Sequence, residues 1–210
     1  MPIICLEGAS AVGKTTTCTT IANIGNTYVV PEVNLLFERP KNMSKTWYLE
    51  RQVERWKIAK RKLCEYDFVI LDGDIFQPLC YNWCFHFEIF NQSLTFLHEF
   101  YESEIKVGNI LFPDKYFYLH TSTDNIRSRK ENDQTRQRGN FEKHIRIIEP
   151  HQRYYEVLNQ FVPHIVQLVE ASNMEHNVKV IMDNVPLEPL CKDSEGLLNH
   201  ITDWLTNSKA

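Results

Sequence analysis

The residues with the clearest chemical meaning lie near the N-terminus, where two glycines precede a lysine and a threonine. The segment Gly8-Ala9-Ser10-Ala11-Val12-Gly13-Lys14-Thr15, followed by Thr16, matches the pattern G-x-x-x-x-G-K-[ST] at every fixed position. In this P-loop pattern, backbone N–H groups surround phosphate, the lysine bridges the β- and γ-phosphates and the hydroxyl ligates Mg²⁺. The apolar run before it and the helical pattern after it supply the required context. The segment predicts a site for a nucleoside triphosphate and Mg²⁺.

Two acidic residues are expected to complete this site from other strands. Asp72 ends the apolar run 67–71, where a carboxylate can reach Mg²⁺, and Asp74 is the alternative. Glu32 follows the run 27–30 and is expected in the same crevice, because ligands bind at the carboxyl ends of parallel strands. A carboxylate there suits a general base for a hydroxyl acceptor and would repel a phosphorylated acceptor. The competing interpretations are a turn aspartate and a glutamate that starts a helix.

The segment 124–146 is almost devoid of apolar residues and lies between well-patterned elements. It predicts a mobile lid over about 124–140, with a solvated linker helix as the alternative. Guanidinium groups beside a triphosphate can neutralise charge that develops during phosphoryl transfer. We favour this role for at least one of the first two of its arginines, and surface ion pairing remains open for all four: Arg127, Arg129, Arg136 and Arg138.

The helical pattern at 45–64 is the candidate acceptor-binding element. Tyr48 and Gln52 share one face by their i, i+4 spacing, and Gln52 is a candidate to read the edge of a heterocycle. Arg51 and Arg55 lie on a different face, where solvated charge is the simpler interpretation.

The apolar segments alternate with helical patterns along the whole chain, which predicts a parallel sheet covered by helices on both faces. We expect strands at 2–6, 27–30, 67–71, 115–120 and 178–182, and helices at 13–23, 45–64, within 79–105 and from 194 onward. At 210 residues, a single domain covering 1–210 is expected.

Composition excludes several classes of function. The net charge of −4 argues against broad nucleic-acid binding, which needs an excess of basic residues. No apolar run has membrane-spanning length, no signal peptide is recognisable, and the cysteine usage fits the cytoplasm. Cys80, Cys84 and His86 form a C-x3-C-x-H cluster, but no second pair at zinc-ligand spacing accompanies it. We therefore expect these three residues to be structural.

Together these motifs resemble the deoxynucleoside kinase and thymidylate kinase families. The opening ICLEGASAVGKTT resembles their first strand and P-loop, YVVPEV their V-V-P-E-P stretch, FVILDGD their acidic strand end, and 124–146 their Arg-rich lid. The resemblance implies the sheet order 2-3-1-4-5, ATP with Mg²⁺ as donor, Glu32 as base and a homodimer. The thymidylate-type spacing to Asp72 also adds Arg51 to the acceptor site.

Two departures from these families concern the acceptor. Gly73 stands where they have an arginine after the strand-end acid, and Pro-Glu-Pro is reduced to Pro31-Glu32-Val33. The resulting prediction is an ATP-dependent kinase that phosphorylates a nucleoside-like hydroxyl compound. The alternatives are a kinase of another hydroxyl compound such as an antibiotic, a nucleoside monophosphate kinase, and a nucleotide-binding regulatory switch.

Overall fold

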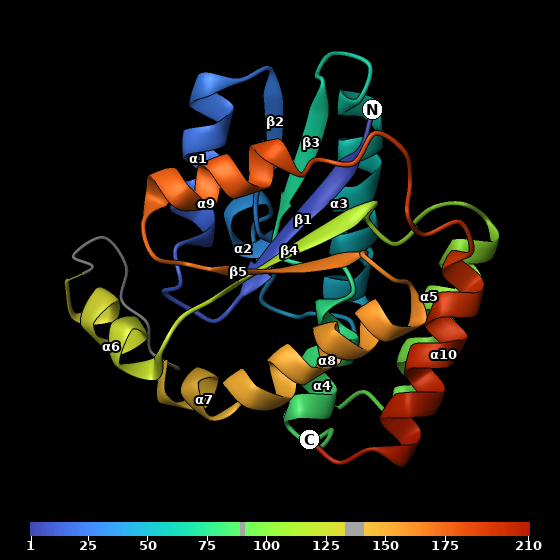
Figure 1. Ribbon diagram of the computed structural model, residues 1–210. Coiled ribbons are helices and arrows are strands. Elements are labelled where there is room, and N and C mark those ends of the chain that lie inside the picture. Colours follow the sequence, from blue (N-terminus) through green and yellow to red (C-terminus); the bar gives the residue numbers. More distant parts are fainter. Residues whose placement is uncertain (89–90, 133–140) are drawn as a thin grey trace.

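The computed structural model describes residues 1–88, 91–132 and 141–210. Five parallel strands form one sheet in the order β2-β3-β1-β4-β5, as predicted, with helices on both faces (Figure 1). The strands are β1 (Ile3–Gly8), β2 (Thr27–Val30), β3 (Phe68–Asp72), β4 (Lys115–His120) and β5 (Val166–Glu170). The architecture is a three-layer α/β sandwich.

The prediction of the fifth strand at 178–182 was wrong. These residues lie in α9 (Met174–Asp183), and the strand is Val166–Glu170. In α9, Val178 and Ile181 are buried at i, i+3 spacing, and the Asn173 side chain caps the helix by accepting from the backbone N–H of His176. A five-residue apolar run such as VKVIM does not distinguish a strand from a turn of buried helix, because both periodicities fit it.

The core divides into two layers because alternate residues of each strand point to opposite faces. Ile3 and Cys5 contribute to one layer, and Ile4 and Leu6 to the other. The second layer packs under α1 (Lys14–Ile24) and α9. The remaining helices are α2 (Val33–Leu36), α3 (Trp47–Lys62), α4 (Gln77–Cys84), α5 (Leu94–Lys106), α6 (Thr123–Asn132), α7 (Phe141–Arg146), α8 (Ile148–Phe161) and α10 (Ser194–Asn207).

One helical prediction needs correction, and the predicted start of the C-terminal helix is confirmed. The helical region expected within 79–105 is two helices, α4 and α5, separated by a loop. The expected C-terminal helix begins at Ser194, where the Asp193 carboxylate accepts from the N–H of Gly196. The Asp193 cap explains the position of this start.

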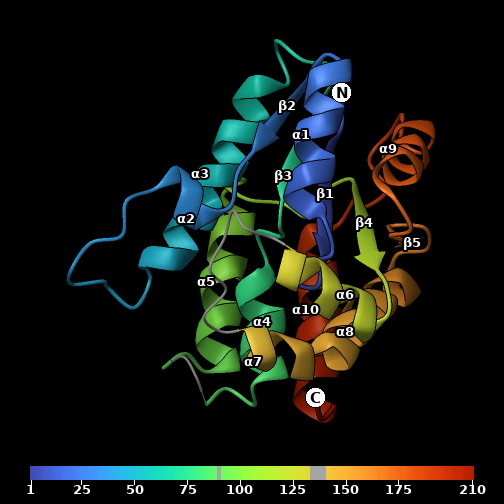
Figure 2. The same cartoon turned by 90° about the vertical axis from the view of Figure 1, so that its left-hand side faces the viewer.

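Strand register brings the candidate site residues to one edge of the sheet. Leu6 pairs with Asp72, Val30 pairs with Leu71, and Gly8 pairs with Leu119. The P-loop, Asp72 and the chain leaving β2 toward Glu32 therefore lie together at the carboxyl ends of neighbouring strands. The loop between α2 and α3 projects from the body of the molecule on this side (Figure 2).

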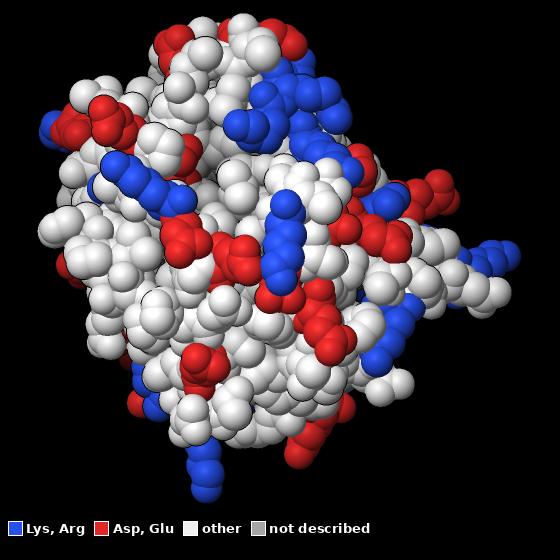
Figure 3. Space-filling model, turned by 90° about the vertical axis from the view of Figure 1, so that its right-hand side faces the viewer, with Lys and Arg blue, Asp and Glu red and all other residues white. Residues whose placement is uncertain are grey.

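The surface carries both signs of charge. On the face seen in Figure 3, basic side chains gather near the top, and acidic and basic side chains lie beside one another elsewhere. Within the described ranges, no helix combines the length and the apolar character needed to cross a membrane.

Candidate active site

A cavity of about 870 Å³ opens at the carboxyl ends of the strands. Its floor is formed by the P-loop together with Glu7, Glu32 and Asp72, so it unites the ends of β1, β2 and β3. Its walls come from the α2–α3 loop, α3, α4 and one arginine of α6. A cavity of this size at this edge is where an open α/β sheet binds ligands.

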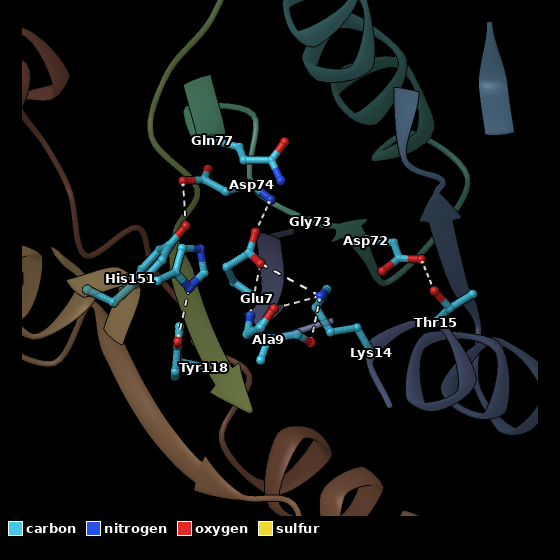
Figure 4. A network of polar contacts seen from close by, with 12 residues as sticks. Glu7, Ala9, Lys14, Thr15, Asp72, Gly73, Asp74, Gln77, Tyr118 and His151 are labelled. Carbon is cyan, nitrogen blue, oxygen red and sulfur yellow. Dashed lines mark hydrogen bonds and ion pairs between the residues drawn. The ribbon is translucent and has the colours of Figure 1, made fainter. Parts of the chain in front are cut away.

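The P-loop geometry depends on glycine at Gly8. Its φ is +139°, and a Cβ there would lie 2.2 Å from the carbonyl oxygen of Leu119. No other residue fits between β1 and β4 at this point. α1 begins at Lys14, whose Nζ donates to the Gly8 carbonyl at 2.7 Å and lies 3.9 Å from Glu7 Oε1 (Figure 4). The ammonium group is thus held over the loop that would receive phosphate.

Thr15 and Asp72, the two predicted metal ligands, contact each other directly. The Thr15 hydroxyl donates to Asp72 Oδ2 at 2.8 Å (Figure 4). Asp72 is 1% exposed, and its Oδ1 has no hydrogen-bond partner. Burial raises the pKa of this carboxyl group, and the Lys14 charge opposes the shift. A hydroxyl and a carboxylate with a spare oxygen fit Mg²⁺, which takes few protein ligands beside phosphate oxygens and water.

Asp74, the alternative metal ligand, also borders the cavity, but its carboxylate oxygens are hydrogen-bonded to buried tyrosines. Its Oδ1 accepts from the Tyr116 hydroxyl at 3.2 Å and its Oδ2 from the Tyr155 hydroxyl at 3.1 Å. Burial raises the pKa of the Asp74 carboxyl group to about 7. These bonds occupy both oxygens, so Asp72 is the better placed of the two acids to meet Thr15.

Glu7 is a site residue that the sequence reasoning did not single out. It is 2% exposed, and its two oxygens accept from the backbone N–H of Gly8 at 2.9 Å and of Asp74 at 2.7 Å. It therefore fastens the start of the P-loop to the end of β3 (Figure 4). Its signal was the acidic residue directly before the first glycine of the motif.

Glu32 lies in the cavity at the start of α2, and its side chain reaches toward Gly73. A Cβ on Gly73 would lie 3.7 Å from Glu32 Cγ and 3.8 Å from Glu7 Oε2. Gly73 has a φ of +83°, so a side chain at this position would also be strained. The residue that departs from the family pattern therefore borders two carboxylates of the cavity.

The two leading arginines of the predicted lid separate in the structure. Arg129 lines the cavity, donates to the Val12 carbonyl at 2.7 Å and also donates to the Ala171 carbonyl. Arg127 lies away from the cavity lining, with a 43% exposed side chain that pairs with Glu142 at 2.6 Å. Arg136, Arg138 and residues 133–140 of the predicted lid lie outside the described residues.

The acceptor helix only partly follows its prediction. Tyr48 lines the cavity, and its hydroxyl donates to Gln77 Oε1 at 2.9 Å. Gln52 is fully buried and accepts from Arg55 Nη1 at 2.7 Å, so the structure does not bring it to the cavity lining. Arg51 also lies outside that lining, 5.3 Å from the Phe37 ring centroid.

Arg55 was expected to be solvated, which is wrong because it is 1% exposed. It reaches from α3 to the cavity lining and donates to the carbonyls of Pro31 at 2.8 Å, Asp72 at 2.7 Å and Gly73 at 2.9 Å. Helical periodicity predicts which face of α3 carries Arg55. It does not show that backbone carbonyls of other elements lie close enough to accept hydrogen bonds from its guanidinium.

In the C-x3-C-x-H cluster, the thiols of Cys80 and Cys84 are buried with their sulfurs 3.9 Å apart, whereas His86 is exposed. Among the described residues no group of three His, Cys, Asp or Glu side chains is arranged to hold a metal ion.

The fold is similar to those of known kinases. No protein-family model and no curated protein sequence matches the chain. Deoxyadenosine kinase from M. mycoides with bound dATP has a TM-score of 0.52 and 16% identity over 87% of this chain and 98% of that one. The same kinase with the products dCMP and dCDP has a TM-score of 0.52 and 18% identity over 86% and 96%. Thymidylate kinase from Candida albicans has a TM-score of 0.55 and 12% identity over 87% and 92%.

The chain thus has the fold of the P-loop kinases that act on nucleosides and nucleotides. The resemblance to deoxynucleoside and thymidylate kinases is confirmed at the level of the fold, over most of the chain.

Proposed function

We propose that this protein is an ATP-dependent kinase that transfers the γ-phosphoryl group to a hydroxyl of a nucleoside-like compound. The observation that carries the proposal is the cavity in which a P-loop faces both Glu32 and Asp72. A nucleotide-binding switch needs the phosphate site alone. A kinase also needs a base for the acceptor hydroxyl, and Glu32 is a carboxylate beside the phosphate site that can serve as this base.

Each of the cavity residues has a separate role in the proposed phosphoryl transfer. The P-loop amides and Lys14 bind the β- and γ-phosphates, and Thr15 with Asp72 would hold Mg²⁺, which supplies charge neutralisation on those phosphates. Arg129, whose guanidinium contacts the P-loop carbonyl of Val12, would stabilise charge on the transferred group. Glu32 takes the proton of the attacking hydroxyl and so raises its nucleophilicity.

The choice of acceptor rests on Glu32 and not on the overall charge of the cavity. The lining combines the acids Glu7, Glu32, Asp72 and Asp74 with the bases Lys14, Arg39, Lys45, Arg55 and Arg129. Glu32 is a carboxylate beside the P-loop that would repel a phosphorylated acceptor, and no arginine directly follows Asp72 in the sequence. The fold is shared with a deoxyadenosine kinase whose structures contain dATP, dCMP and dCDP, which supports a nucleoside acceptor. It is also shared with a thymidylate kinase, so the fold alone does not separate nucleoside from monophosphate acceptors.

The proposal is tested by measuring ADP release from ATP and Mg²⁺ with a panel of acceptors. The panel contains nucleosides, nucleoside monophosphates and aminoglycoside or other hydroxyl antibiotics. We expect nucleosides to accelerate ADP release and the phosphorylated product to appear in equal amount, with Lys14→Ala inactive on the same panel. Acceleration by monophosphates alone would reject the role of Glu32. ATP binding without acceleration by any acceptor would identify a regulatory switch.

A further inference from the structure

An unexplained polar atom lies in the wall of the cavity, on α4. Asn82 is 2% exposed and lines the cavity, and its Oδ1 has no hydrogen-bond partner. A buried carbonyl oxygen without a partner is unfavourable, and such atoms are rare in folded proteins. The oxygen itself is closed off from solvent, so a ligand group that donates to it must first displace the side chains that cover it. The new hydrogen bond would then remove the cost of the unpaired carbonyl.

The orientation of the Asn82 amide is determined by its other end. Its Nδ2 donates to the Pro78 carbonyl at 2.8 Å and to Gln92 Oε1 at 3.4 Å. Exchanging the nitrogen and oxygen would set Oδ1 against the Pro78 carbonyl, which cannot donate. Gln92 is itself fixed, because its Nε2 donates to the Lys45 carbonyl at 2.8 Å. The free atom of Asn82 is therefore an acceptor held in place before any ligand binds.

The surroundings of Asn82 fit a flat ring better than a flexible chain. Tyr81 precedes it on α4 and lines the same cavity, with its ring edge-on to those of His144 and His151. Gln77 lines the cavity one turn earlier, and its Oε1 is occupied by the Tyr48 hydroxyl. This wall of α4 offers an aromatic surface, a fixed carbonyl and the amide of Gln77.

We propose that Asn82 Oδ1 accepts a hydrogen bond from an amino group on the ring of the phosphoryl acceptor. Asn82 then selects amino-substituted nucleosides, such as adenine or cytosine nucleosides, over analogues that lack the amine. The proposal rests on the proposed kinase function. In this proposal Asn82 on α4 recognises the heterocycle of the acceptor, a role that the sequence analysis had given to Gln52. The side-chain carbonyl of Gln52 already accepts a hydrogen bond from Arg55.

The test uses matched acceptor pairs that differ at the amine. kcat/KM is measured for deoxyadenosine against the deoxyriboside of unsubstituted purine, and for deoxycytidine against deoxyuridine. We expect the kcat/KM of the wild type to be higher for the amino member of each pair by about tenfold to a hundredfold. An analogue without the amine leaves Asn82 Oδ1 buried and unpaired, and this cost lowers its kcat/KM. Asn82→Leu, or Asn82→Ala if the first variant does not fold, should bring both ratios close to one.

Asn177 provides the matched control. It is also a buried asparagine with an unpartnered Oδ1, 4% exposed, but lies in α9 and does not line the cavity. Asn177→Leu should leave both ratios at the wild-type value.

The remaining outcomes separate this inference from the function on which it rests. Equal use of both members by the wild type would overturn the role of Asn82 and leave the kinase assignment intact. Equal losses for both members in Asn82→Leu would make Asn82 a structural residue only. Failure of every nucleoside to be phosphorylated would overturn both proposals.

Discussion

The guanidinium of Arg55 donates to the backbone carbonyl of Asp72, with 2.7 Å between Nη2 and the oxygen. The same side chain donates to Pro31 at 2.8 Å, directly before Glu32. One buried charge therefore joins the end of β2 to the end of β3. It fixes the backbone from which the candidate base and the candidate metal ligand both project, so their relative position depends on a residue that reaches them from α3.

Replacing Arg55 by methionine should lower both stability and turnover. Its removal leaves the carbonyls of Pro31, Asp72 and Gly73 without their donor, and each such loss costs about 1–3 kcal/mol. We expect the free energy of unfolding to fall by roughly 3 kcal/mol in denaturant titrations. Arg61→Met, on the exposed end of α3, is the control and should change little. Wild-type kcat in a correctly folded Arg55→Met would show that Arg55 does not position the strand ends.

Glu32→Gln should preserve ATP binding and lower kcat by at least about a hundredfold, the lower limit of general-base catalysis. Rapid-quench measurement of the phosphorylated product tests this loss of kcat. Full activity in the variant would reject Glu32 as the base, and a lower acceptor KM would move the assignment to monophosphate kinases.

Lys14→Ala should nearly abolish phosphoryl transfer while the protein stays folded. The Lys14 ammonium contacts the P-loop carbonyls and Glu7, all on the first strand and its loop, so little of the core depends on it. Turnover and thermal unfolding are measured side by side. Unchanged turnover at unchanged stability would show that the P-loop does not bind the transferred phosphate.

Arg129 and Arg127 allow a paired test of the lid arginines. Arg129→Gln should lower kcat by about a hundredfold, because a preorganised charge-stabilising donor contributes this much in other enzymes. Arg127→Gln should lose only its exposed ion pair with Glu142, which is worth little. The kcat of each variant, measured in the steady state with saturating ATP, distinguishes the two arginines. A larger loss of kcat in Arg127→Gln than in Arg129→Gln would assign the phosphoryl-binding role to Arg127 instead.

His151 should make stability sensitive to acid. Burial lowers its pKa from 6.5 to about 3, aided by the Lys14 and His144 charges, and its Nδ1 lies 3.0 Å from the Tyr118 hydroxyl. Between pH 6.5 and about 3 the unfolded chain binds a proton that the folded protein excludes. Stability should therefore fall as pH falls through this window, by up to about 1.4 kcal/mol per pH unit.

His151→Gln should remove this contribution, which appears as a smaller slope of unfolding free energy against pH. The exposed His176 provides the control, since His176→Gln should keep the wild-type slope. An unchanged slope in His151→Gln would mean that His151 is not buried as a neutral imidazole.

The sequence by itself determined the P-loop motif and the type of fold. The P-loop is a contiguous motif that depends on local backbone conformation, so Gly8, Lys14 and Thr15 could be predicted as phosphate-site residues from their spacing alone. The alternation of strands and helices likewise predicted the parallel sheet, and Asp72 and Glu32 followed because strand ends converge at one edge.

Tertiary structure decided the residues whose roles depend on contacts between distant elements. Arg55 and Arg51 are alike in sequence, yet only the fold shows that the carbonyls of β2 and β3 lie within reach of Arg55. Arg129 separates from Arg127 because α6 turns one toward Val12 and the other toward Glu142. The apolar run of α9 was mistaken for a strand for a similar reason. Short local patterns satisfy several structures, and packing against the rest of the chain selects one of them.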